Sequence, residues 1–248
     1  MRLTAEINRR THMTPAQMAD SLVDYRTGEI KNARFDLKDS FREFVERVKT
    51  SEQFANTGPT IVLSPLASAM LKKYTEESNT SGKEMSFSIR GVKIHEGNKN
   101  ILVGAYIAPA AEFENRHASQ VDIDPLKEET GATKLVNQTN LASYLENTSG
   151  SPRGKDFGIG HIHHTKLVKE HWGKPSSGDY QQVERYFQSP EFTEFTWLVI
   201  TKQPDGKMVY TALRSYRDET ARVVHDKIKI FELEESFQEL GKNPENQQ

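Results

Sequence analysis

Cysteine is absent from this chain of 248 residues. Its absence excludes disulfide bonds, thiol nucleophiles and thiolate metal ligands. Any metal ion bound by side chains would therefore need His, Asp or Glu. A chain without cysteine also fits a reducing compartment, where disulfides do not form.

Long hydrophobic runs are also missing. The chain has no uninterrupted apolar stretch of the roughly 18 residues that a membrane-spanning helix needs. Residues 1–22 contain no apolar run of the kind found in signal peptides. We therefore expect a cytoplasmic protein that does not act at a membrane.

An excess of one charge is the third absence. The chain carries 33 Lys and Arg against 35 Asp and Glu, for a formal net charge of −2. Nearly balanced charge produces no long-range field that would attract nucleic acid or an anionic membrane. We expect neither as a partner.

Three regions are predicted along the chain. Residues 1–57 form a charged, mainly helical extension, residues 58–217 form the main domain, and residues 218–248 form a C-terminal helix with a flexible tail. In the extension, apolar residues at near-helical spacing predict an amphipathic helix over residues 35–48. Its apolar face can pack on the main domain, or it can bind a protein partner or a second copy of the chain.

The main domain alternates between strand and helix patterns. Ser64 and Pro65 suit the N-cap and first position of a helix that runs to about Glu77. Alternating apolar and polar residues from Glu84 to Arg90 predict a half-buried strand. Further strands are predicted over 100–109, 119–125 and 157–164, helices within 133–147 and 180–188, and a hairpin over 195–216 that turns through "PDG". The fold class is α/β of the α+β type, with helices packed on a sheet.

Histidines concentrate in "GHIHH", within the strand predicted over 157–164. Side chains two residues apart on a strand point to the same side, so His161 and His163 can reach one ion while Ile162 faces the core. Taken alone, such a pair is also compatible with a solvated strand face.

A carboxylate follows at Asp179, at the start of the helix predicted over 180–188. Asp179 and Ser176 can serve simply as capping residues there. Alternatively, Asp179 completes a set of two imidazoles and one carboxylate. That set leaves the fourth position of a tetrahedral zinc open, as in catalytic sites.

These residues, in this order, resemble the JAMM motif of the JAB/MPN metalloprotease domain. The motif has a strand-borne Glu, then His-x-His and then Ser-x-x-Asp. In "EMSFSIRG", Glu84, Ile89 and Gly91 match the first element; "GHIHH" and "PSSGD" supply the other two. The resemblance covers about residues 58–216. It implies a JAB/MPN-like central mixed sheet flanked by helices.

The sequence departs from the family pattern at three places. The loop before Ser176 is longer, His164 stands where a proline is common, and Phe87 stands where a glycine is frequent.

The resemblance also implies a function. It implies one Zn²⁺ per chain held by His161, His163 and Asp179, with Glu84 as general base and Ser176 as donor to the oxyanion. The reaction would be amide hydrolysis, and in this family it is often isopeptide cleavage that releases ubiquitin or a ubiquitin-like protein.

Two alternative functions remain, and the roles of three residues in the loop before Ser176 stay open. The chain can act on small peptides or amino-acid conjugates, or it can be a non-catalytic MPN-like scaffold, although the complete motif argues against the scaffold. Trp172 and His171 are candidates for the substrate groove, and Trp172 can equally close a small cluster beneath the loop. The longer loop also offers His164 or His171 as a further ligand.

Overall fold

The computed structural model describes most of the main domain. The described residues are 23–24, 29–30, 37–55, 58–97, 99–109, 141, 144–145, 158–167, 169–190 and 192–232. Among them, no helix has the length and apolar character needed to cross a membrane. The strand predicted over 119–125 and the connector over 148–156 lie outside these residues. Of the helix predicted within 133–147, Leu141, Tyr144 and Leu145 are described, and all three are helical.

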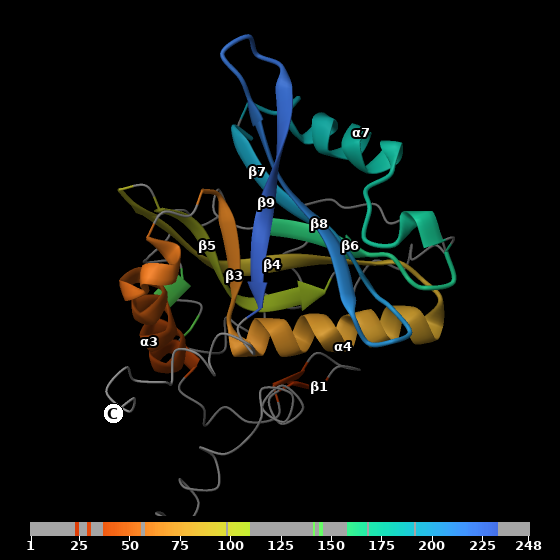
Figure 1. Cartoon of the computed structure of the whole chain (residues 1–248), viewed down its shortest axis with the longest axis horizontal. Coiled ribbons are helices and arrows are strands. Elements are labelled where there is room, and N and C mark those ends of the chain that lie inside the picture. Colours follow the sequence, from red (N-terminus) through yellow and green to blue (C-terminus); the bar gives the residue numbers. More distant parts are fainter. Residues whose placement is uncertain are drawn as a thin grey trace, which may run out of the picture.

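Seven strands close into a mixed barrel (Figure 1). They are β3 (Thr60–Leu63), β4 (Met85–Glu96), β5 (Lys99–Pro109), β6 (Gly158–Ile162), β7 (Glu194–Lys202), β8 (Met208–Arg217) and β9 (Val223–Glu232). Their order around the barrel is β3-β5-β4-β6-β7-β8-β9, and β9 pairs with β3 to close it. The β3–β5, β3–β9 and β6–β7 pairs are parallel, and the others are antiparallel. A separate two-stranded sheet joins β1 (Val23–Asp24) and β2 (Glu29–Ile30).

Three α-helices accompany these strands in the described part of the chain: α3 (Leu37–Thr50), α4 (Pro65–Ser81) and α7 (Ser177–Tyr186). The protein is therefore a mixed α/β protein, as predicted. A short 3-10 helix, η1 (Glu52–Phe54), follows α3, and another, η2 (Lys169–His171), precedes α7. In Figure 1, α4 runs along one side of the barrel and α7 lies beside β7 and β8.

The helix start predicted at Ser64 and the apolar face predicted within residues 35–48 are both confirmed. The Ser64 hydroxyl caps α4 by accepting a hydrogen bond from the Ala67 N–H, and Gly82 ends the helix in the left-handed conformation. On α3, the apolar side chains predicted to share one face are buried in the main core: Phe41, Phe44, Val45 and Val48. The packing alternative accounts for this face.

The C-terminal helix predicted from residue 218 is wrong over Val223–Glu232, which forms β9. Lys227 and Lys229 are exposed while Ile230 is buried, so this stretch follows the period of two that strands have. Pairing with both β8 and β3 stabilises it as a strand. The same stretch closes the predicted sheet into a barrel. The residues from 233 onward, where the tail was predicted, lie outside the described part.

The prediction that β4 is half-buried is also wrong. Both faces of the strand are buried from Met85 to Ile89, including Ser86 and Ser88. β4 pairs with β5 on one edge and β6 on the other. The apolar and the polar residues from Met85 to Ile89 therefore lie on two different faces that are both buried, and neither face is open to solvent.

Gly91 lies at an irregularity in the β4–β5 pairing, between Arg90 and Gly91. A Cβ added to Gly91 would lie 1.9 Å from the Val103 carbonyl oxygen, which is a backbone atom and cannot move away easily. We predict that Gly91→Ala lowers the free energy of unfolding by about 1–3 kcal/mol, measured by urea denaturation. Gly58→Ala is the control, because a Cβ there meets nothing within 4 Å. Equal stability of the two variants would contradict this packing.

Glu194 links two strands that do not pair with each other. It accepts from Lys93 on β4 at 2.9 Å and from Arg214 on β8 at 2.6 Å. Burial raises the pKa of Glu194, but these hydrogen bonds and the positive charges of Lys93 and Arg214 together lower it by more, so the net pKa is below its ordinary value. A carboxylate whose pKa is depressed by folding stabilises the protein above the unfolded-state pKa, and this stabilisation is lost as pH falls through the folded-state pKa.

We therefore predict that Glu194→Gln lowers stability at pH 7 by roughly 0.5–1 kcal/mol, since these groups remain partly open to solvent. The difference from the wild type should shrink as the pH falls below the ordinary glutamate range. Urea denaturation at a series of pH values measures it, with the exposed Glu219→Gln as control. A difference that does not change with pH would mean that the ion pairs do not account for it.

Candidate metal centre

β6 ends at Ile162, one residue before His163, but the His163 N–H still donates to the Ile200 carbonyl of β7, so both histidines lie on one side. Ile162 is buried in the main core, whereas Ile159 belongs to a second core cluster that includes Val183 of α7. His161 shares the face of Ile159, so it points toward α7. The Nε2 atoms of His161 and His163 lie 2.8 Å apart. The prediction that these side chains reach one point while Ile162 faces the core is confirmed.

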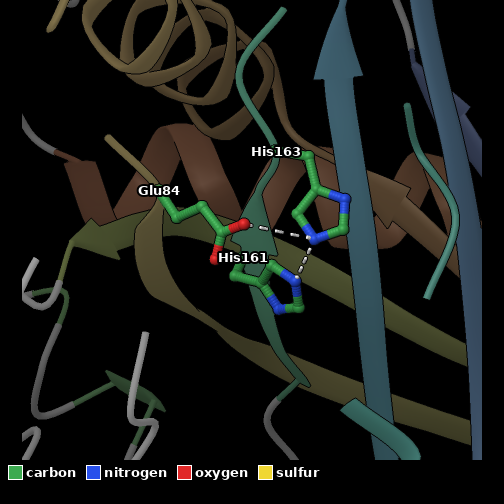
Figure 2. Close-up of side chains that lie close together, drawn as sticks. All are labelled: Glu84, His161 and His163. Atoms are coloured by element: carbon green, nitrogen blue, oxygen red, sulfur yellow. Dashed lines mark hydrogen bonds and ion pairs between the residues drawn. The ribbon is translucent and has the colours of Figure 1, made fainter. Parts of the chain in front are cut away.

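The β4–β6 register positions Glu84. Met85 pairs with Ile162 in this antiparallel ladder, so Glu84 lies opposite His163 when the register is extended by one residue. Residues directly opposite each other in such a ladder point to the same face. The Glu84 Oε1 atom is 3.7 Å from the His163 Nε2 atom (Figure 2).

The start of α7 supplies a second carboxylate. Ser176 and Asp179 form a capping box: the Ser176 hydroxyl accepts from the Asp179 N–H, and the Asp179 side chain accepts from the Ser176 N–H. This uses one carboxylate oxygen, Oδ2. The other, Oδ1, lies 3.3 Å from the His161 Nε2 atom. Asp179 is therefore both a capping residue and a neighbour of the histidine pair.

These positions can hold a metal ion. Ligand atoms of Glu84, His161 and His163 all lie within 4.8 Å of one another, and each of these residues is 4% exposed. Ligands around a tetrahedral ion at about 2.0–2.1 Å are themselves roughly 3.3 Å apart. The observed separations of 2.8, 3.3 and 3.7 Å bracket that spacing. Glu84, predicted as a base, thus lies close enough to be a ligand.

The hydrogen bonding of His163 determines its tautomer. Its Nδ1 atom lies 2.7 Å from the backbone carbonyl oxygen of His171. A carbonyl oxygen can only accept, so Nδ1 carries the proton. Burial lowers the pKa of His163, which favours the neutral ring. In a neutral ring protonated at Nδ1, the Nε2 atom carries a lone pair that points into the group.

The electrostatics of the group favour a cation. Burial lowers the pKa of His161, and the charge of Asp179 only partly opposes this, so His161 is also neutral. Burial and, to a smaller extent, the negative charge of Asp179 together raise the pKa of Glu84 to about 8. The negative charges of Glu84 and Asp179 repel each other, and no Lys or Arg side chain belongs to the group that converges. A bound cation would offset this and favour the ionised form of Glu84.

The other predicted site residues lie in the loop between His163 and Ser176. The side chain of His171 is exposed, so its backbone carbonyl, not its imidazole, serves the site. His164 is buried, and its Nδ1 atom accepts from the Lys166 N–H. Neither imidazole belongs to the group that converges. The half-buried Trp172 donates its indole N–H to the Leu167 carbonyl within the loop. The role of the His171 carbonyl was not foreseen, because a main-chain group has no sequence signal.

Comparison with known proteins supplies no family. No family model matches the chain, and no curated protein matches it. The chain is similar to the solution structure of protein DSY2949 from Desulfitobacterium hafniense, a structural genomics target. That likeness has 14% identity and a TM-score of 0.40, and it covers 69% of this chain and 93% of the other. It adds nothing to the chemistry of the site, which depends on the residues described above.

Proposed function

We propose that this chain is a zinc-dependent amide or isopeptide hydrolase of the JAMM type, with a JAB/MPN-like domain, and that it removes or processes ubiquitin or a ubiquitin-like protein. One observation carries the proposal. Side chains from the residue before β4, from the end of β6 and the residue after it, and from the start of α7 converge: Glu84, His161, His163 and Asp179. In the motif, the two histidines and the aspartate correspond to zinc ligands, and the glutamate corresponds to the general base.

The donor set fits zinc. Neutral imidazole nitrogens and carboxylate oxygens are common zinc ligands, and no thiolate is needed. His161, His163 and Asp179 would hold the ion, with one Zn²⁺ per chain. Three protein ligands leave a fourth position for water or substrate, which distinguishes a catalytic site from a closed structural one.

When bound, Zn²⁺ lowers the pKa of water toward neutrality and polarises the substrate carbonyl. Glu84 would accept a proton from the attacking water and return it to the departing amine. Ser176 accepts from the Asp179 N–H, and a hydroxyl that accepts can still donate its own proton, here to the developing oxyanion. Carbonyl attack by water with proton transfer to the amine completes hydrolysis of an amide.

A small peptide or amino-acid conjugate is the second candidate substrate. The near-complete burial of the two imidazoles and Glu84 favours it, because only a narrow group can approach them. Asp179 is the most open of the four side chains, at 14% exposure, so approach is expected from its side. Trp172 and His171 remain the candidates for contacts with substrate along the loop.

Metal analysis with a substrate panel tests the proposal. We expect about one zinc per wild-type chain, and none in a His161→Ala/His163→Ala variant whose circular dichroism spectrum is unchanged. The wild type should cleave precursors with a C-terminal extension, isopeptide conjugates or short peptides, and the variant should cleave none. Cleavage of short peptides alone would select the second candidate. Zinc-free wild type that hydrolyses nothing would instead favour a scaffold that binds a protein partner.

A further inference from the structure

We infer that the loop of residues 164–175 is a positioning device for the metal ligand His163, and that Gly173 is the residue that fixes it. This inference rests on the proposed metal centre. The loop fills the twelve positions between His163 and Ser176, where the motif usually has fewer. Its inner hydrogen bonds show what the additional length provides.

The carbonyl oxygen of His171 accepts two hydrogen bonds. One of its lone pairs accepts from the His163 Nδ1 atom at 2.7 Å, and the other accepts from the Lys174 N–H at 3.2 Å. A carbonyl that orients an imidazole through Nδ1 keeps the Nε2 lone pair directed at the metal position. If this carbonyl moved, the ring would lose both its orientation and its preferred tautomer.

Gly173 attaches the loop to the barrel, two residues beyond that carbonyl. Its N–H donates to the Thr201 hydroxyl on β7 at 2.9 Å, and its carbonyl accepts from the Thr211 hydroxyl on β8 at 2.7 Å. Thr201 is completely buried. Gly173 has a φ of +59°, and an added Cβ would lie 2.5 Å from the Val209 carbonyl oxygen. Backbone conformation and space therefore both require glycine here.

The beginning of the loop is held separately, by α4. The Asn79 side chain accepts from the Thr165 N–H at 2.9 Å and donates to the Lys202 carbonyl at 2.7 Å. The loop is thus attached to the helix at one end and to β7 and β8 at the other. Only the second attachment lies beside His171, so its loss should affect His163 directly.

Zinc affinity and the absorption spectrum of the Co²⁺-substituted protein test the inference. We expect Gly173→Ala and Thr201→Val to bind Zn²⁺ about 10–100-fold more weakly, with an altered Co²⁺ spectrum. Thr201→Ser keeps the hydroxyl and should restore wild-type behaviour. Gly206→Ala is the matched control, because Gly206 also has a positive φ, of +87°, but a Cβ there meets nothing within 4 Å.

The outcomes separate this inference from the proposed function. Folded Gly173→Ala and Thr201→Val variants with wild-type zinc affinity and an unchanged Co²⁺ spectrum would overturn the positioning role alone. If Gly173→Ala does not fold, Thr201→Val and its serine counterpart decide the result. Long-range ¹H–¹⁵N spectra of the metal-free wild type should show His163 protonated at Nδ1, and the opposite tautomer would also overturn the inference. A wild type that binds neither metal would remove the centre itself.

Discussion

Glu84→Gln should lower amide hydrolysis by a factor of roughly 10²–10⁴ while zinc content stays near one per chain. Glutamine has the shape of glutamate but cannot accept a proton from water. Glu84 lies directly before β4, opposite His163, where its carboxylate reaches the group without leaving the register of the sheet. The loss should therefore appear in the rate of the chemical step.

Single-turnover hydrolysis and metal analysis on the same preparation check this prediction. Glu96→Gln, at the exposed far end of β4, is the control and should leave both quantities unchanged. A Glu84→Gln variant that loses zinc together with activity would make Glu84 a ligand, which its distance to His163 also permits. Full activity would show that Glu84 has no part in proton transfer.

Asp179→Ala should abolish zinc binding and hydrolysis together. Its Oδ1 atom is 3.3 Å from the His161 Nε2 atom, and no other carboxylate comes as near to that nitrogen among the ion pairs of the described residues. The substitution also removes half of the capping box of α7, so we expect about 1 kcal/mol lower stability in addition. Two effects in one variant require a control that separates them.

Ser176→Ala is that control for zinc content. It removes the other half of the same capping box without removing a carboxylate, so it should lose similar stability and keep its zinc. Metal analysis and urea denaturation of both variants give the comparison. If Asp179→Ala binds zinc normally, Asp179 is only a capping residue, and Glu84 completes the ligand set with the two histidines.

Local sequence patterns correctly predicted local structure. Ser64 and Pro65 identified the start of α4, and "PDG" identified the turn between β7 and β8. The pattern failed at β9, because a strand there depends on pairing with β8 and with β3, a segment more than 150 residues earlier. No local period reports a partner so distant in the chain.

The sequence by itself determined which chemical groups are available and which of them share a face. The spacing of His161 and His163 commits both to one side of a strand, and the lack of cysteine restricts the ligands to imidazole and carboxylate. The tertiary structure decided which carboxylates meet them. The β4–β6 register brings Glu84 beside His163, and the packing of α7 on β6 brings Asp179 beside His161. Register and packing arise from contacts between distant segments, and the His171 carbonyl that orients His163 is a main-chain group that every residue carries.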